Sequence, residues 1–212
     1  MSVSEDRENV APAVQPIAAP AAPIADPGPL GLAAFALTTF LLSAVNARWT
    51  TGNSAGTAFL GYALAYGGLA QLLAGMWEFR NRNVFGATAF SSYGAFWIGL
   101  GIWALKVAPS AGTGNAFANH DIAWILLAFA IFNSYMLLMA TQVNLAVFGV
   151  FLTLELTEIV LAIGNFANSP GTVQLGGYIG IVTAVVAWYT SAAGVANGLG
   201  GTIRLPVGKP FV

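Results

Sequence analysis

The stretch DPGPLGLAAFALTTFLLSAVN, residues 26–46, is a long apolar run whose one charged residue, Asp26, stands at its start. Residues 30–47 carry no charge, and a helix of that length, rising about 1.5 Å per residue, crosses a hydrocarbon core of roughly 30 Å. The run lacks the alternation of polar and apolar residues that a barrel strand needs. It therefore predicts a helix that spans a membrane, with Pro27 and Pro29 stiffening the approach to it.

Five further apolar segments of similar length follow along the chain. They lie near residues 55–77, 85–107, 121–141, 145–166 and 175–196, and the separators are rich in residues that break helices. We expect an all-α integral membrane protein with a six-transmembrane-helix bundle in residues 26–198, followed by a C-terminal cytoplasmic tail in residues 199–212. Gly176 and Gly180 form a GxxxG pattern, which we interpret as helix packing.

The overall composition supports a lipid environment. Of 212 residues, 57% are hydrophobic and 7% are charged, and the mean hydropathy is +0.74. A soluble domain has about 25% charged residues, which cover its water-facing surface. The net charge of −1 argues against nucleic acid as a partner, because nucleic-acid binding requires a basic face.

The chain has few residues that could perform catalysis. It contains no cysteine, which excludes disulfides, thiolate metal sites and cysteine nucleophiles. Its one histidine, His120, falls in the loop before the fourth segment and cannot build a two-histidine metal or haem site. We therefore expect no cofactor, no metal, no catalytic residue and no enzyme activity.

The two ends of the chain and the basic residues suggest an orientation. Residues 1–25 are a charged and then Pro/Ala-rich tail without a periodic apolar face, which predicts disorder and not a signal peptide. With six spans, the side of the termini holds Arg7, Arg80, Arg82, Arg204 and Lys209, against Arg48 and Lys106 on the other side. This excess predicts cytoplasmic termini and a multi-pass protein of the cell membrane, plasma or inner.

One face of the first segment combines apolar and hydrogen-bonding side chains. Positions i, i+3, i+4, i+7 and i+11 of that helix are Phe35, Thr38, Thr39, Leu42 and Asn46. We interpret Thr38, Thr39 and Asn46 as pore-lining. The alternative is that the threonines bond to carbonyl groups of their own helix, which is common in membranes.

The expected anion site is a weak one. Around Leu30, Gly31 and Leu32 the start of the helix offers unpaired N–H groups and the positive end of a dipole, which suit a carboxylate. A protein that held a carboxylate tightly would use a buried arginine. The arginines that follow the tail all fall at span ends, so hydroxyls, amides and backbone N–H groups must form the site. Weak binding favours throughput, because an ion must both enter and leave.

Three polar residues of the second and third segments are further candidates. Gln71 falls near mid-membrane and is either a helix–helix hydrogen bond or a pore group. Glu78, seven residues after Gln71, lies on the same helix face at the cytoplasmic end, beside Arg80 and Arg82. There we expect a surface ion pair or a loop anchor. Tyr93 falls well inside the third segment, where its hydroxyl needs a partner.

The fifth segment carries two glutamates inside the bilayer. Glu155 falls near the midplane and Glu158 a turn further on, and such groups face protein or water and not lipid. The positions Leu154, Glu158, Leu161 and Asn165 lie on one stripe, and we count Asn165 as pore-lining. Low dielectric favours the protonated acid, so either glutamate could donate or shuttle a proton. The alternative is a hydrogen-bonded glutamate that fixes a helix contact, even one between subunits.

Three blocks of sequence resemble a known family. The block DPGPLGLAAFALTTFLLS, residues 26–43, resembles the Asn-Pro-Ala-Pro-Leu-Gly-Leu signature that opens the acetate uptake transporter family, with Asp26 and Gly28 standing for its Asn and Ala. The resemblance continues through YGGLAQLLAGMWEFRNRNVFGATAFSSYGAFW, residues 66–97, and returns at LAIGN, residues 161–165. It covers most of the chain from residue 26 onward.

The resemblance implies a six-helix protomer that assembles as a homo-hexamer, with one anion pathway in each protomer. In the family, three residues narrow the pathway, and the resemblance implies, by motif position, that they correspond to Phe35, Tyr93 and Leu154 here. The family's mid-membrane glutamine matches Gln71, and its cytoplasmic-end glutamate matches Glu78. Glu155 and Glu158 have no counterpart in the matched pattern.

We therefore expect transport of acetate and related short carboxylates, succinate among them, by a low-affinity channel-like or proton-coupled mechanism. One alternative is a conduit for ammonium, ammonia or another small solute, which a single histidine in a loop disfavours. Another is a membrane enzyme, or a scaffold or signalling protein. For an enzyme, only Glu155 and Glu158 in the fifth segment could serve as a catalytic pair.

Overall fold

The computed structural model describes residues 24–50, 57–106 and 116–211, and the helices dominate all three parts. The first segment is α1 (Gly28–Asn46), and the second is one continuous run of α2 (Thr57–Leu64), η1 (Ala65–Ala70) and α3 (Gln71–Arg80). Then come α4 (Val84–Lys106), α6 (Ala116–Ala140), α7 (Leu145–Phe166) and α8 (Pro170–Gly198). The prediction of an all-α chain is confirmed. The predicted tail, residues 1–25, lies almost entirely outside the described residues.

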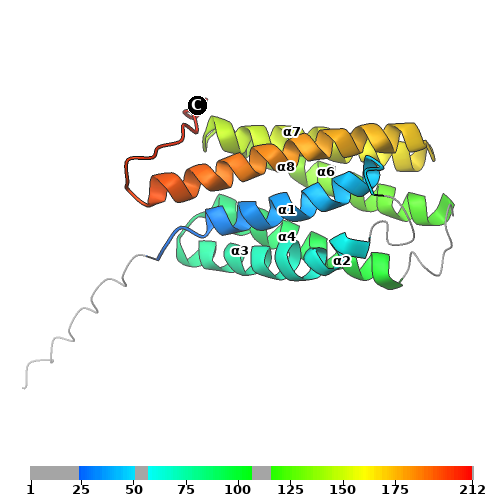
Figure 1. The fold of residues 1–212 in the computed structure, drawn as a ribbon, viewed down its shortest axis with the longest axis horizontal. Helices are drawn as coiled ribbons and strands as arrows, with labels where there is room; N and C mark the ends of the chain where they lie inside the picture. The colour runs from blue at the N-terminus through cyan, green and yellow to red at the C-terminus, as the bar shows by residue number, and fades with distance from the viewer. Residues whose placement is uncertain (1–23, 51–56, 107–115, 212) are drawn as a thin grey trace, which may run out of the picture.

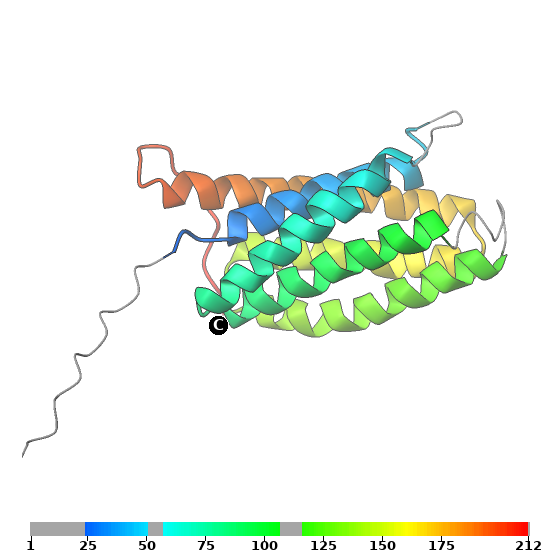
Figure 2. The ribbon, with the colours of Figure 1, turned by 90° about the horizontal axis from the view of Figure 1, so that it is seen from below.

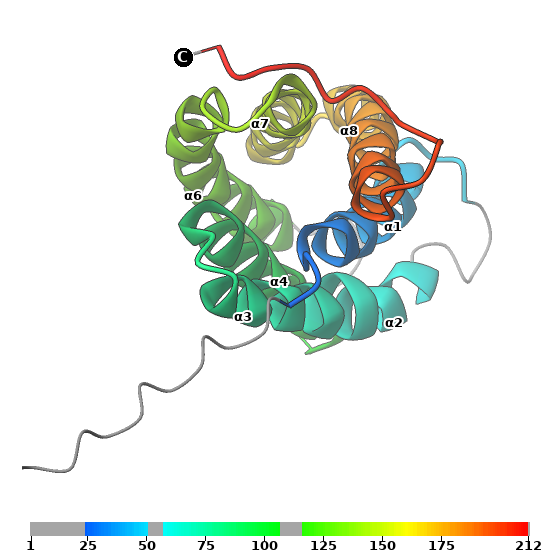
Figure 3. The same ribbon diagram turned by 90° about the vertical axis from the view of Figure 1, so that its left-hand side faces the viewer.

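The long helices form a closed ring when viewed along the bundle (Figure 3). Contacts connect α1 to α8, α8 to α7, α7 to α6, α6 to α4, α4 to α3, and α3 back to α1. Side views show the helices running lengthwise, with the first and last described residues at the same end of the bundle (Figures 1 and 2). A ring of this kind has an interior that belongs to one chain alone.

Within the described residues, five helices are long and apolar enough to cross a membrane. They are Gly28–Asn46, Phe59–Arg80, Asn119–Ala140, Leu145–Phe166 and Pro170–Gly198. The remaining long helix, α4, is 23 residues long but rich in glycine, serine, tyrosine and tryptophan, which lower its hydropathy. Much of α4 is buried against its neighbours, including Tyr93, Trp97 and Leu100.

Small residues allow the helices of the ring to approach closely. Gly67 lies in the π-helical turn η1, directly against Thr38 of α1, and a Cβ there would overlap the threonine hydroxyl. On the other side of α1, a Cβ at Gly177 of α8 would lie 2.8 Å from the backbone carbon of Asn46. Close contacts of this kind replace the hydrophobic driving force that lipid does not supply.

The helix ends extend beyond the predicted spans. α8 begins at Pro170, and not near residue 175, because proline at a first helical position needs no N–H partner. α6 begins at Ala116, so His120 lies in a helix and the prediction of a loop there is wrong. At the other end, residues 199–211 fold back over the start of α7 and the turn before it, where Ala146 N donates to Val207 O at 2.9 Å and Phe211 N donates to Thr141 O at 2.8 Å.

Candidate functional site

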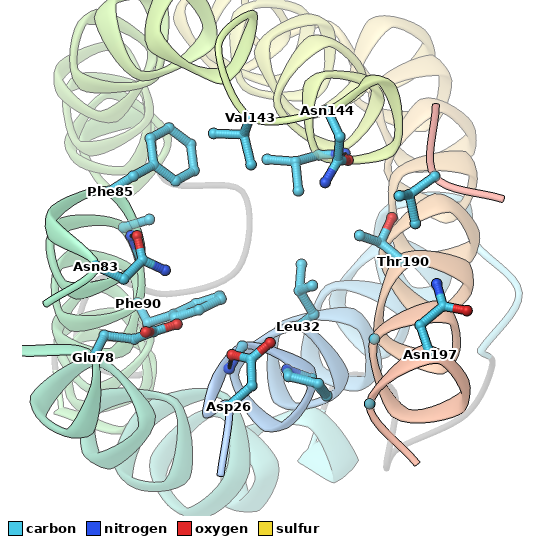
Figure 4. A pocket seen from close by; sticks show the side chains of 18 of the residues that line it. Asp26, Leu32, Glu78, Asn83, Phe85, Phe90, Val143, Asn144, Thr190 and Asn197 are labelled. Carbon is cyan, nitrogen blue, oxygen red and sulfur yellow. Dashed lines mark hydrogen bonds between the residues drawn. The ribbon is translucent and has the colours of Figure 1, made fainter. Parts of the chain in front are cut away.

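Four cavities follow one another through the ring. The largest, which we call the acidic vestibule, measures about 360 Å³ and opens at the end of the bundle where the described chain begins and ends (Figure 4). Its lining includes two carboxylates and three amides, from Asp26, Glu78, Asn83, Asn144 and Asn197. The close-up shows the carboxylates of Asp26 and Glu78 on the same side of this cavity.

Two small chambers continue from the acidic vestibule. The near chamber measures about 20 Å³ and shares Leu32, Ala89, Phe90 and Phe151 with the vestibule; Gln71 also lines it. The far chamber measures about 40 Å³, and its polar lining comes from Thr39, Ser43, Asn46, Trp97, Thr157 and Glu158. Since about 10–15 Å³ of such space admits one water, each chamber has room for only a few heavy atoms.

Beyond the far chamber lies a polar cavity of about 240 Å³, which we call the amide vestibule. Asn46 lines both cavities, and Asn119, Asn165 and Asn168 add further amides. The guanidinium-bearing Arg48 also lines this vestibule, next to the N-terminal end of α8 at Ser169 and Pro170. The row of cavities thus has carboxylates at one end and a cationic side chain with helix N–H groups at the other.

Three residues border both chambers, and they are Phe35, Tyr93 and Leu154. They come from α1, α4 and α7, on three different sides of the ring. The rings of Phe35 and Tyr93 meet edge to face, with centroids 5.8 Å apart and planes at 65°. All three side chains are buried, and they form the junction between the near and far chambers.

A buried hydrogen-bond network starts at Tyr93, one of the three residues of this junction. The hydroxyl of Tyr93 lies 3.0 Å from Asn133 Oδ1 on α6 and 3.3 Å from Glu158 Oε1 on α7. Asn133 Nδ2 donates to Phe151 O at 2.9 Å and to Glu155 Oε2 at 2.6 Å. Ser134 Oγ donates to Glu155 Oε1 at 2.8 Å. The two glutamates therefore belong to one network, Glu158 at the far chamber and Glu155 toward α6.

Several buried polar atoms along the cavities make no hydrogen bond within the described part of the chain. They are Glu78 Oε1, Gln71 Oε1, Thr39 Oγ1, Trp97 Nε1 and Glu158 Oε2, and each residue lines one of the three successive spaces. A buried polar atom without a partner costs about 1–3 kcal/mol. Atoms of this kind gathered along one row mark a candidate site for polar contacts with a bound molecule.

Comparison with known proteins agrees with this geometry. Residues 8–209 match the GPR1/FUN34/yaaH family. The chain belongs to the GPR1/FUN34/yaaH family. Five helices among the described residues have the length and composition to span a membrane, and the chain matches a bacterial acetate channel and a fungal acetate permease, so it is a multi-pass membrane protein.

Three relatives illustrate the range of this family. Accumulation of dyads protein 2 of Saccharomyces cerevisiae is 42% identical over 185 residues, covering 84% of this chain and 64% of the relative. Ammonia transport outward protein 2 of the same yeast is 37% identical, with the same coverage. The succinate-acetate/proton symporter SatP of Escherichia coli is 32% identical, covering 88% of this chain and 96% of SatP. The chain thus spans slightly less than two thirds of the yeast relatives.

A solved structure of the bacterial acetate channel SatP has the same fold. It superposes with a TM-score of 0.79 at 32% identity, covering 87% of this chain and 99% of that one.

Three residues that the sequence analysis predicts to line the pathway of this chain do not line its cavities. Leu30 is 47% exposed on the outside of α1, and Gly31 packs against the ring of Phe90, where a Cβ would lie 2.7 Å from ring carbons. Thr38 Oγ1 donates to Ala34 O of its own helix at 3.1 Å and lies 3.4 Å from Tyr62 O. None of the three lines the four cavities described: Gly31 and Thr38 contact neighbouring helices, and Leu30 lies on the surface of the described chain.

The surroundings of Glu78 also differ from the prediction. It is not at the surface but fully buried, and its Oε2 accepts a hydrogen bond from Asn81 Nδ2 at 3.1 Å. Asn81 belongs to the turn between α3 and α4, so this contact anchors that turn. At least one of the cavities is lined by each of the other residues predicted to line the pore, which are Leu32, Thr39, Asn46, Gln71 and Asn165.

Two residues of the site were missed by the sequence analysis. Trp97, four residues after Tyr93 and on the same face of α4, lines the far chamber with a donor-only indole. Asn133 lies fully buried in α6. Its signal was an amide in the middle of the apolar run ILLAFAIFNSYMLLMA, where a polar side chain needs a partner.

Proposed function

We propose that this chain carries acetate and similarly small carboxylates, succinate among them, across a membrane through the row of four cavities. The observation that supports this most directly is the junction of the two small chambers, where Phe35, Tyr93 and Leu154 meet between the acidic and the amide vestibules. The names of the bacterial relatives, a succinate-acetate/proton symporter and an acetate channel, supply the class of cargo.

The proposed passage begins at the amide vestibule. Arg48 and the side-chain amides attract an anion there, since a cationic vestibule raises the local anion concentration. In the far chamber the hydroxyl of Thr39 and the indole N–H of Trp97 replace part of its hydration. The anion then passes the junction singly and meets Gln71 in the near chamber before it reaches the acidic vestibule.

We assign the proton-linked role to Glu158, with Glu155 as its neighbour in the network. Glu158 is 3% exposed, lines the far chamber, and keeps Oε2 free of hydrogen bonds within the described residues. A buried carboxylate without a paired cation opposes the passage of a second anion, whereas the protonated acid donates to it. Protonation of Glu158 would thus couple the passage of a carboxylate to a proton.

For the assembly we propose six spans with both termini in the cytoplasm, and a homo-hexamer with one pathway per protomer. The closed ring of one chain encloses its own row of cavities, so each protomer has a complete path. The location of the first and last described residues at one end fits an even number of spans (Figure 2). Ser134 is exposed on α6 beside Glu155, and such polar groups at mid-helix favour a protein neighbour over lipid.

The test is uptake of labelled acetate by liposomes that contain the purified protein. We expect uptake well above that of empty liposomes, competed by propionate more strongly than by ammonium. A Leu154→Trp variant should abolish uptake by filling the junction, whereas Leu156→Trp, on the exposed face of the same helix, should not. Uptake no faster than in empty liposomes for acetate, formate, propionate, lactate and succinate would refute the proposal.

A further inference from the structure

Asn133 lies at the centre of the network, and its orientation is fixed by its neighbours. Its two amide hydrogens are both used, one by Phe151 O and one by Glu155 Oε2. An amide turned over would point its oxygen at these two acceptors. Asn133 Oδ1 must therefore face the hydroxyl of Tyr93, which lies 3.0 Å away.

The hydroxyl of Tyr93 has one hydrogen and two neighbours that can accept it. Asn133 Oδ1 lies at 3.0 Å and Glu158 Oε1 at 3.3 Å. If the hydrogen goes to Asn133, the contact with Glu158 is a hydrogen bond only when Glu158 itself carries a hydrogen. If Glu158 is ionised, the hydroxyl turns to the stronger, charged acceptor. Asn133 Oδ1 then loses its donor in a fully buried place.

The hydrogen-bond donors around the two glutamates favour a carboxylate at Glu155 and a protonated acid at Glu158. Glu155 accepts from Asn133 Nδ2, and the Ser134 hydroxyl, which also reaches Ala130 O at 2.9 Å, lies 2.8 Å from its Oε1; both neighbours suit a carboxylate. Glu158 receives only a hydroxyl that Asn133 also attracts. The titratable groups that act on Glu158 are Tyr93 on α4 and Glu155 on its own helix, and Tyr135 on α6 acts on Tyr93. From α1, the far chamber adds only the hydroxyls and the amide of Thr39, Ser43 and Asn46, and α8 packs beside it through the Thr157–Thr183 hydroxyl contact.

We propose that Asn133 is a positioning residue, which holds the Tyr93 hydroxyl away from Glu158 and so keeps on Glu158 the proton that a carboxylate takes as it passes. The inference rests on the proposed carboxylate pathway. In the transfer, the O–H bond of Glu158 breaks as an O–H bond forms on the cargo carboxylate, which leaves as the neutral acid. The Tyr93 hydroxyl turns to the new Glu158 carboxylate, and water from the vestibules returns a proton to Glu158 afterwards.

The test is a double-mutant cycle of Asn133→Leu and Tyr93→Phe, with two readouts. One is the pH at which acetate uptake is half-maximal. The other is the infrared C=O band of a protonated carboxyl group, assigned to Glu158 by its loss in Glu158→Gln and titrated in liposomes without any cargo. Asn133→Leu frees the Tyr93 hydroxyl for Glu158, so both midpoints should fall, by about one pH unit for a tenfold change in proton affinity.

Comparing Asn133→Leu in the wild type with Asn133→Leu in the Tyr93→Phe variant distinguishes a positioning role of Asn133 from a merely structural one. Tyr93→Phe should raise the midpoint, because ionised Glu158 loses its donor, and in that background Asn133→Leu should have little further effect. An equal shift in both backgrounds, or no shift, overturns the inference. The control is Thr153→Val on α7, whose hydroxyl bonds only to carbonyl groups of its own helix, at Gly149 and Val150; it should leave the midpoint unchanged.

The two readouts keep this inference separate from the proposed function. If liposomes show no carboxylate uptake, the proposed function fails, and the infrared titration alone still decides whether Asn133 acts on Glu158 through Tyr93. If Asn133→Leu does not fold, Tyr93→Phe provides the test, because an unchanged infrared midpoint in that variant overturns the inference.

Discussion

The rings of Phe35 on α1 and Tyr93 on α4 meet edge to face, 5.8 Å between centroids, at the point where the near and far chambers join. Leu154 of α7 closes the third side of this junction. The two rings stabilise each other through this contact, whereas Leu154 can be replaced without breaking the aromatic pair. The width of the junction, and with it the length of cargo that passes, should therefore depend most simply on residue 154.

Leu154→Ala should admit longer carboxylates. The substitution removes three carbon atoms from the junction and leaves the contact between Phe35 and Tyr93 intact. Since one methylene in a fitted apolar site changes the rate ratio by about 10-fold or more, we expect butyrate uptake relative to acetate to rise by roughly that factor. The comparison of labelled butyrate and acetate in liposomes measures it. Leu156→Ala, on the exposed face of α7, should leave the ratio unchanged, and an unchanged ratio in Leu154→Ala would disprove a junction there.

Arg48→Gln should weaken the capture of anions at the amide vestibule. Arg48 has a backbone φ of 61°, a strain that glutamine bears equally, so the change removes charge with little effect on the turn. Uptake at low acetate concentration and low salt should fall by roughly tenfold, and the difference should shrink in about 1 M salt, where charges are screened within about 3 Å. Lys209→Gln, which lines none of the cavities, should not show this salt dependence. The same loss at every salt concentration would argue against electrostatic capture.

Asp26→Asn should increase anion passage through the acidic vestibule. Asp26 Oδ1 accepts a hydrogen bond from Gly28 N at 2.8 Å, and an asparagine oxygen can keep this bond while the negative charge is lost. We expect acetate uptake at low salt to rise about twofold or more, since a like charge at the mouth repels the cargo. Asp121→Asn, at the start of α6 and outside the four cavities, is the matched control. Equal uptake in Asp26→Asn and the wild type would show that this mouth does not limit the rate.

The fold was largely predictable because hydropathy over 18 or more residues reports what crosses a membrane. The ends of the helices were less predictable, as the first turns of α8 show. Gly171, Thr172 and Gln174 lower the hydropathy there, yet Pro170 allows the helix to begin before them. Hydropathy reports the solvent of a segment, whereas helix ends depend on local hydrogen bonds.

The site was predictable only in part, and two adjacent threonines show why. Thr38 and Thr39 are neighbours in sequence, but successive residues of a helix point about 100° apart. Thr39 lines the far chamber, whereas Thr38 packs against η1, and the sequence does not tell which side of α1 faces the interior. Asn133 was missed for a related reason, because its role arises from contacts with α4 and α7 that have no trace in local spacing.

Gly177→Ala should destabilise the bundle. A Cβ at this position would lie against the backbone of α1 at Ala47 and Asn46, and a backbone cannot move aside as a side chain can. We expect a loss of about 1–3 kcal/mol, the usual cost of overpacking, seen as a lower unfolding temperature in detergent. Gly171→Ala, in the same helix but with no atom within 4 Å of its Cβ position, should be neutral or slightly stabilising. Equal unfolding temperatures for the two variants would contradict this close packing of α1 and α8.

Glu158→Gln should separate the passage of acetate from the passage of protons. The glutamine amide can donate to the Tyr93 hydroxyl as a protonated glutamate does, so the network and the far chamber keep their shape, but no proton can leave. We expect downhill exchange of labelled acetate to continue, while an imposed pH gradient no longer drives accumulation above equilibrium. Thr153→Val is the control, on the same helix, outside the four cavities and outside the network, and it should retain a response to the gradient. Liposomes that hold a pH gradient with equal acetate on both sides measure accumulation directly. If the pH dependence of uptake coincides in the wild type and in Glu158→Gln, then Glu158 only fixes the contact between α4 and α7, and the proton must follow another route.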